Sequence, residues 1–234
     1  MPRGYAYPAS IFVKGDNDTA KLAFELAFVA SWLKAGGSLV AMLIEFPTTA
    51  LFKQALQDLF QVNTDDYVKK IMFVGFDARQ DTCEQIDPHT AQANFLQPDT
   101  WNKVIDLAEL QTEPSPIGTL VYAAALDLLL HSPTYVDAAL ERVAHTLKKE
   151  KTRSYLFSVT ARAKNTSIKA WEEAADNLAV VHTSKNGLAS VMLMQPHLPS
   201  NVLDIEIPLS PKLTGLNEKA ATTRLKVQQE IEGV

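Results

Sequence analysis

Residues 11–45 read IFVKGDNDTAKLAFELAFVASWLKAGGSLVAMLIE, and this pattern sets the architecture of the whole chain. Its first apolar run, Ile11 to Val13, is typical of a strand buried on both faces of a parallel sheet. The segment that follows has apolar residues on nearly every side, as expected of a buried helix. Gly36-Gly37 end that helix, and Ser38 to Ile44 return as a second apolar strand. The stretch therefore predicts a βαβ unit whose loop opens at the carboxyl edge of a parallel sheet.

The loop of this unit carries a resemblance to a known family. GDNDTAKL at 15–22 aligns without gaps to the phosphate-loop pattern G-x-x-x-x-G-K-[ST], and the order of elements around it resembles the RecA/KaiC-like ATPase domains. The resemblance covers roughly residues 8–208. It implies a three-layer α/β fold with a mostly parallel central sheet and a C-terminal antiparallel meander. In that family the second strand ends in an acidic residue that activates water, and Glu45 stands at this position.

Most motif residues of the phosphate loop are replaced. Ala20 stands where the second glycine is expected, and Leu22 stands where a hydroxyl binds magnesium. Asp18 fills a position that KaiC-like loops usually give to glycine, and with Asp16 it adds charge that repels a triphosphate. A Cβ also opposes the close backbone approach that phosphate binding requires. The candidate site is therefore a degenerate phosphate loop made of Gly15, Asp18, Thr19, Ala20, Lys21 and Leu22, in which Thr19 or Asp18 caps the helix.

A second strand of the family is also altered. Residues 118–130, GTLVYAAALDLLL, resemble the strand that positions magnesium, but Ala123 stands where an aspartate should close the apolar run. Asp127 comes four residues later, in a predicted turn or helix, and is the candidate replacement for that carboxylate. The phosphate loop and the strand end at Ala123 thus both lack residues that ATP hydrolysis requires. This combination predicts a domain that kept the fold and lost ATP hydrolysis.

Composition is consistent with one globular domain. The chain has 234 residues with 47% hydrophobic content, and we expect residues 1–211 to form the RecA/KaiC-like domain and 212–234 its C-terminal helix. A net charge of −5 argues against a general affinity for nucleic acid or anionic membranes. No apolar stretch has the length of a membrane span, so we expect a cytoplasmic protein. The single cysteine, Cys83, excludes an internal disulfide and a multi-cysteine metal site, and we predict no metal site.

Three other segments are candidates for contacts with partner proteins. Residues 77–100 are polar and predicted to be irregular, including Asp87-Pro88-His89, which we interpret as a solvated turn and not as a metal ligand pair. The loop from Arg162 to Ser167 follows a predicted strand at 154–161 and carries exposed positive charge. Residues 216–232 form a predicted helix with a narrow apolar stripe, which packs either on its own domain or on a neighbour.

Three functions remain open at this point. The first is a non-catalytic assembly or scaffold subunit that forms a homo-oligomer or binds a paralogous RecA-like subunit, with no cofactor. The second is a divergent regulator that binds ATP and magnesium through Lys21 and Glu45. The third is an unrelated doubly wound α/β protein, in which GDNDTAKL is only a turn and helix cap and Lys21 is a surface lysine.

Overall fold

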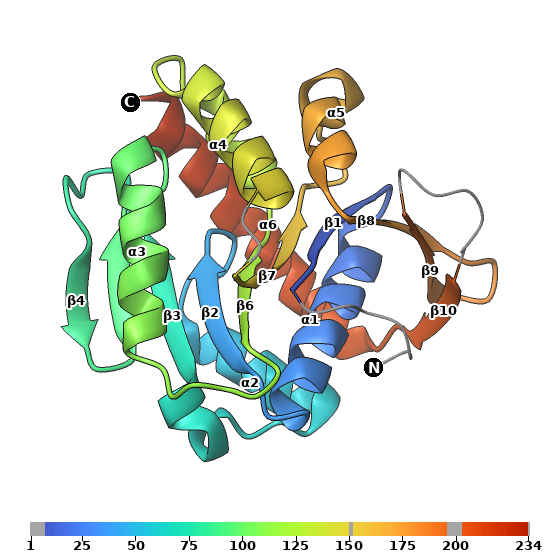
Figure 1. Cartoon of the computed structure of the whole chain (residues 1–234). Helices are drawn as coiled ribbons and strands as arrows, with labels where there is room; N and C mark the ends of the chain where they lie inside the picture. Colours follow the sequence, from blue (N-terminus) through green and yellow to red (C-terminus); the bar gives the residue numbers. More distant parts are fainter. Residues whose placement is uncertain (1–7, 150–151, 196–202, 234) are drawn as a thin grey trace.

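The computed structural model describes residues 8–149, 152–195 and 203–233 (Figure 1). Its centre is one ten-stranded sheet in the order β10-β9-β8-β1-β7-β6-β2-β3-β5-β4. The strands are β1 (Ser10–Gly15), β2 (Ser38–Leu43), β3 (Ile71–Phe76), β4 (Glu84–Asp87), β5 (Thr90–Ala93), β6 (Thr119–Ala123), β7 (Ser154–Ser158), β8 (Asn177–Thr183), β9 (Leu188–Met194) and β10 (Leu203–Pro208). The run from β8 to β5 is parallel, and β4, β9 and β10 are antiparallel to their neighbours.

The predicted βαβ unit is confirmed. Strand β1 lies between β7 and β8, and its apolar residues are fully buried because helices cover both faces of the sheet. The C-terminal meander is confirmed as well, with the turn at Asn186-Gly187 joining β8 to β9 through a glycine at φ +72°. The connection PHLPSN at 196–201, which we also assigned to the meander, lies outside the described residues.

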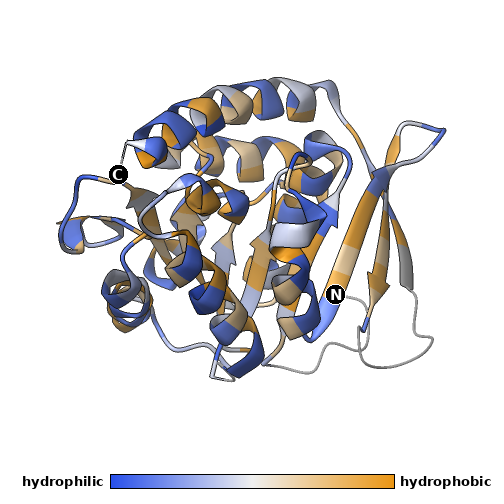
Figure 2. Cartoon of the chain, turned by 90° about the horizontal axis from the view of Figure 1, so that it is seen from above, coloured by the Kyte–Doolittle hydropathy of each residue, from blue (hydrophilic) through white to orange (hydrophobic). Residues whose placement is uncertain are grey.

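Helices form a layer on each face of the sheet. The α-helices are α1 (Asp18–Lys34), α2 (Thr49–Phe60), α3 (Pro98–Leu110), α4 (Val136–Lys149), α5 (Asn165–Ala174) and α6 (Pro211–Glu232), with short 3₁₀ helices η1 (Thr64–Lys70) and η2 (Leu126–His131). One core cluster packs α1 and α2 against the sheet, and the other packs α3, α4 and α5 against the opposite face. Figure 2 shows mostly hydrophobic strands between helices that carry hydrophilic residues. The architecture is the three-layer α/β fold that the sequence predicts.

Helix α6 connects the two layers. Leu213 and Leu216, near its start, belong to the core cluster of α1 and α2, whereas Val227 and Ile231 belong to the opposite cluster. Between them α6 passes the carboxyl ends of β2 and β3, where Arg224 pairs with Glu45, which follows β2, and other α6 residues line a cavity with the end of β3. Its apolar stripe therefore packs on its own domain and not on a neighbour, which were the two alternatives that the sequence left open.

One segment differs from its prediction. Residues 84–93 form a hairpin, with β5 parallel to β3 and β4 at the edge of the sheet, where an irregular segment was expected. The prediction was wrong because the four residues of β4 are exposed and only Ala91 and Ala93 of β5 are buried. Such short edge strands carry almost no apolar periodicity. Within the described residues, no helix combines the length and apolarity needed to cross a membrane.

Candidate functional site

The candidate phosphate loop is shorter than a phosphate cradle requires. Strand β1 ends at Gly15 and α1 begins at Asp18, so only two residues lie between them. Asn17 is the N-cap, and its Oδ1 accepts a hydrogen bond from the Ala20 N–H at 3.1 Å. The predicted caps, Asp18 and Thr19, instead form the first turn of the helix. Residues that would surround a phosphate in the family are therefore helical here.

Gly15 is needed for packing. A Cβ at this position would lie 2.1 Å from the carbonyl oxygen of Val181 in β8. Strand β1 therefore requires glycine at its end to approach β8, whatever the loop binds. The match of Gly15 to the motif is thus explained by the sheet and gives no evidence for phosphate binding.

Lys21 is buried inside the domain. Its side chain is 4% exposed, and its Nζ donates a hydrogen bond to the carbonyl oxygen of Val159, which follows β7. The same Nζ lies 2.9 Å from Oδ1 of Asp18. This position contradicts the surface location expected for Lys21 in an unrelated fold. It also leaves the ammonium group paired within the protein, so it is not directed at an external ligand.

Arg224 of α6 joins the two acidic residues of the candidate site. Its Nη1 lies 2.6 Å from Oε2 of Glu45, and its Nη2 lies 3.3 Å from Oδ2 of Asp18. Asn217 accepts from the same Nη2 at 3.0 Å, and its own amide donates to Thr19 Oγ1 at 3.0 Å. The Arg224 side chain is only 12% exposed. The C-terminal helix thus supplies a buried cation at the carboxyl edge of the sheet.

The sequence contains a signal that identifies Arg224, although the sequence analysis missed it. The buried positions of α6 include Leu216, Ala220, Val227 and Ile231. Arg224 occupies the step between Ala220 and Val227 in this 216, 220, 224, 227, 231 spacing, so it lies on the apolar stripe. A charged residue at such a position is buried and must find opposite charge, because an unpaired buried charge is costly.

Glu25 adds a third carboxylate to the cluster. It lies on α1, accepts a hydrogen bond from the Tyr122 hydroxyl at 3.0 Å, and is also hydrogen-bonded to Ser158. Burial, together with the charge of Glu45, raises the pKa of Glu25 from 4.5 to about 7, against the opposing effect of Lys21. A substantial fraction of Glu25 is therefore neutral at neutral pH.

The other two carboxylates of this cluster respond differently to burial. For Asp18, burial raises the pKa, but Lys21, Arg224 and the Ala161 N–H together outweigh it and leave the pKa below its usual value. For Glu45, burial dominates and raises the pKa, although Arg224 and Lys21 act against it. When Glu25 is protonated and Asp18 and Glu45 are ionised, the two cations balance the two remaining carboxylates. The cluster is close to internal charge neutrality without a ligand.

The space enclosed by this cluster is too small for a nucleotide. Asp18, Lys21, Glu25, Glu45 and Arg224 line a cavity of about 10 Å³ together with residues after β6 and β7. A single water molecule needs about 10–15 Å³ of such volume. A triphosphate therefore does not fit unless α6 or α1 moves. Ala20 and Leu22, which replace motif residues, are 0% and 2% exposed and pack in the core.

Asp127 has a structural role. It lies in η2, directly after β6, and its carboxylate accepts from the Thr160 N–H at 2.7 Å and from the Thr160 hydroxyl at 2.6 Å. These bonds hold the turn that follows β7, so the carboxylate is already hydrogen-bonded within the protein.

Arg162 and Lys164 are exposed next to this turn. Within the part of the chain that the structure describes, no group of three or more His, Cys, Asp or Glu side chains is arranged to hold a metal ion.

The raised pKa of Glu25 predicts a pH-dependent stability. Between the usual pKa of 4.5 and about 7, the folded protein keeps a proton that the unfolded chain releases. Rising pH in this window therefore lowers the free energy of unfolding. We expect Glu25→Gln to reduce this slope and to be more stable than the wild type by about 1–3 kcal/mol at neutral pH. Urea unfolding at several pH values checks this, and equal slopes for both proteins would contradict it.

The comparisons with known proteins concern the fold. No protein-family model matches the sequence, and no curated protein sequence matches it. Among solved structures, a KaiC-like protein of the hyperthermophilic archaeon Pyrococcus horikoshii OT3 superposes with a TM-score of 0.61 at 12% identity, over 89% of this chain and 88% of that chain. An uncharacterised Pyrococcus horikoshii protein, solved in complex with an unknown peptide, gives 0.60 at 14% identity over 86% and 88%. The chain therefore has the α/β fold of KaiC-like proteins.

Proposed function

We propose that this KaiC-like-fold chain neither binds nor hydrolyses ATP and acts as an assembly subunit through contacts with another protein. The observation that carries the proposal is the buried ion network of Arg224, Asp18, Lys21 and Glu45. It uses the lysine and the acid that nucleotide chemistry would need. It also places the C-terminal helix over the carboxyl edge of the sheet, where open α/β sheets bind ligands.

The alternative is a divergent regulator that binds ATP through Lys21 and Glu45. This function requires α6 to withdraw Arg224 and Lys21 to leave Val159 and Asp18. Both moves expose buried charges whose partners have gone, and breaking a buried pair in this way costs about 3–5 kcal/mol. Nucleotide would have to supply that energy in addition to its own binding. The arrangement therefore favours the subunit without nucleotide.

Calorimetry with ATP and magnesium tests the first half of the proposal. We expect no heat of binding up to millimolar nucleotide and no released phosphate, because the cavity holds at most one water. The Arg224→Ala variant is titrated in the same way, because it lacks the cation that blocks the site. A micromolar dissociation constant for the wild type that Lys21→Ala abolishes would refute the proposal and support the ATP-binding regulator.

The available contact surfaces favour a partner that is not a second copy. The apolar stripe of α6 is buried, which removes it from the three candidate segments. In the β4–β5 hairpin, all four residues of β4 are exposed at the edge of the sheet, including Ile86 at 53%. Two β4 strands paired antiparallel about their midpoint would place Glu84 opposite Asp87, and like charges in that position repel. A paralogous subunit with a basic edge strand is the better match.

Light scattering on designed mixtures tests this edge. We expect the wild type to be monomeric, because like charges oppose self-pairing of β4. A variant with Glu84→Lys and Asp87→Lys carries the opposite charge on that edge, so an equimolar mixture with the wild type should form a 1:1 complex. The control carries Glu141→Lys and Glu173→Lys, which lie on α4 and α5. A mixture that stays monomeric would exclude β4 as the contact, and a wild-type dimer would contradict the charge argument.

A further inference from the structure

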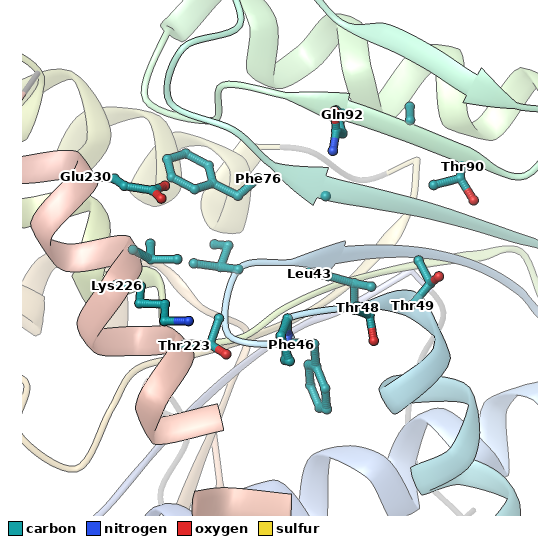
Figure 3. Close-up of a pocket in the computed structure, with 15 residues that line it drawn as sticks. Leu43, Phe46, Thr48, Thr49, Phe76, Thr90, Gln92, Thr223, Lys226 and Glu230 are labelled. Atoms are coloured by element: carbon teal, nitrogen blue, oxygen red, sulfur yellow. The ribbon is translucent and has the colours of Figure 1, made fainter. Parts of the chain in front are cut away.

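A cavity of about 470 Å³ opens at the carboxyl ends of β2 and β3, between α6 and the start of α2 (Figure 3). Apolar walls come from Leu43 and Phe76, and polar groups come from Thr48, Thr49 and Gln92. The volume lies in the range of small-molecule sites, and the carboxyl edge of a parallel sheet is where such sites form. None of the residues of the ion network lines this cavity, so the cavity is open while Arg224 is paired with Glu45 and Asp18.

Two opposite charges on α6 line this cavity. Lys226 and Glu230 are one helical turn apart and both exposed. Within the described residues, neither side chain forms a hydrogen bond or an ion pair, although the charge of Glu230 interacts with that of Arg79. Figure 3 shows the Lys226 ammonium directed toward the side of Phe46 and Thr48, while the Glu230 carboxylate lies next to Phe76. The cavity therefore has a basic end and an acidic end.

The basic end also contains unused backbone donors. Helix α2 begins at Thr49, and the N-cap Thr48 accepts from the Leu51 N–H at 3.2 Å. In the described part of the chain, nothing accepts from the N–H groups of Thr49 and Ala50. These are two of the four backbone N–H groups that have no partner within the helix at its first turn. They attract an anion to the same end of the cavity as Lys226 does.

We propose that this cavity binds a small zwitterion of the amino-acid class. Its carboxylate lies between the Lys226 ammonium and the first turn of α2, its ammonium lies against the Glu230 carboxylate, and its carbon chain packs on Leu43 and Phe76. A simple anion is repelled by the Glu230 carboxylate, and a simple cation is repelled by the Lys226 ammonium. A ligand with both charges is attracted at both ends.

Calorimetry on the full chain tests the proposal with a graded series. The probes are glycine, β-alanine and γ-aminobutyrate, which separate the two charges by increasing distances, with acetate and methylammonium as single-charge controls. We expect at least one zwitterion to bind and to raise the melting temperature, and both controls to bind about tenfold more weakly or worse. Acetate binding as tightly as every zwitterion would overturn the proposal, and so would the absence of binding across the series.

Variants locate the binding in this cavity. Lys226→Gln and Glu230→Gln each remove one charge from an exposed position, so each should weaken binding about tenfold without unfolding the protein. Gly75 lines the cavity, and a Cβ there would lie in ordinary contact, 3.6 Å from Gln92 Cγ, so Gly75→Val adds a side chain to the cavity without a clash at its Cβ. Lys219→Gln is the control on the same helix and lines a different pocket. Binding that survives Lys226→Gln, Glu230→Gln and Gly75→Val would refute the site.

Discussion

Replacement of Arg224 by methionine is expected to destabilise the domain by about 3–5 kcal/mol, the usual cost of removing one partner from a buried ion pair. Methionine keeps most of the side-chain volume, so the loss comes from charge. Glu45 is 7% exposed at its side chain and would retain only Lys21 as a nearby cation. Urea unfolding at neutral pH measures the difference. A change below about 1 kcal/mol would mean that the network is solvated and adds little.

Two further variants separate charge from packing at Arg224. Lys219→Met removes an exposed cation from the same helix, and such surface changes stay within about 0.5 kcal/mol. The double variant of Arg224→Met with Glu45→Gln removes both charges of the closest pair, so it should recover part of the lost stability. Failure to recover any stability would mean that Arg224 acts mainly through its contacts with Asp18 and Asn217.

The same reasoning predicts that deletion of 212–234 unfolds the domain, because it removes Arg224 and the buried stripe of α6.

Restoration of the phosphate-loop motif is expected to damage the fold and to leave ATP binding absent. Leu22→Thr removes a buried leucine and places a hydroxyl among apolar groups, which typically costs about 2–5 kcal/mol. Ala20→Gly adds a smaller cost, because glycine is less favourable than alanine in a helix. The motif would be closer to the family pattern, but residues 18–20 would still be the first turn of α1. Thermal melting and calorimetry with ATP and magnesium measure both outcomes.

Leu110→Thr is the matched control for this variant. Leu110 is also a helical leucine, but it is 83% exposed, so the same substitution there should change stability little. An unchanged melting temperature for the motif-restored protein would show that the loop is open to solvent. Binding of ATP by the restored protein would show that only these two side chains block the site, and it would weaken the proposal of a subunit without nucleotide.

The sequence by itself determined the architecture, because the relevant signals are local. Apolar runs of strand length, the helix with apolar residues all round and the Asn186-Gly187 turn each depend on neighbouring residues. They predicted the central βαβ unit and the C-terminal meander. Comparison with the motif also identified Ala20, Leu22 and Ala123 as replaced positions. The edge hairpin was missed because its strands have four residues each, with β4 fully exposed and only two alanines of β5 buried, so they carry almost no apolar pattern.

The tertiary structure alone decided what the loop residues contact. Lys21 matches a phosphate-binding lysine in sequence, but burial against Val159 and Asp18 determines that it pairs internally. Arg224 and Glu45 are 179 positions apart, and no local pattern links them. Charge pairing depends on distance in space and on exclusion of water, which sequence spacing does not encode. The path of α6 across the sheet edge brings these charges together, and that path follows from how its apolar stripe packs against both layers.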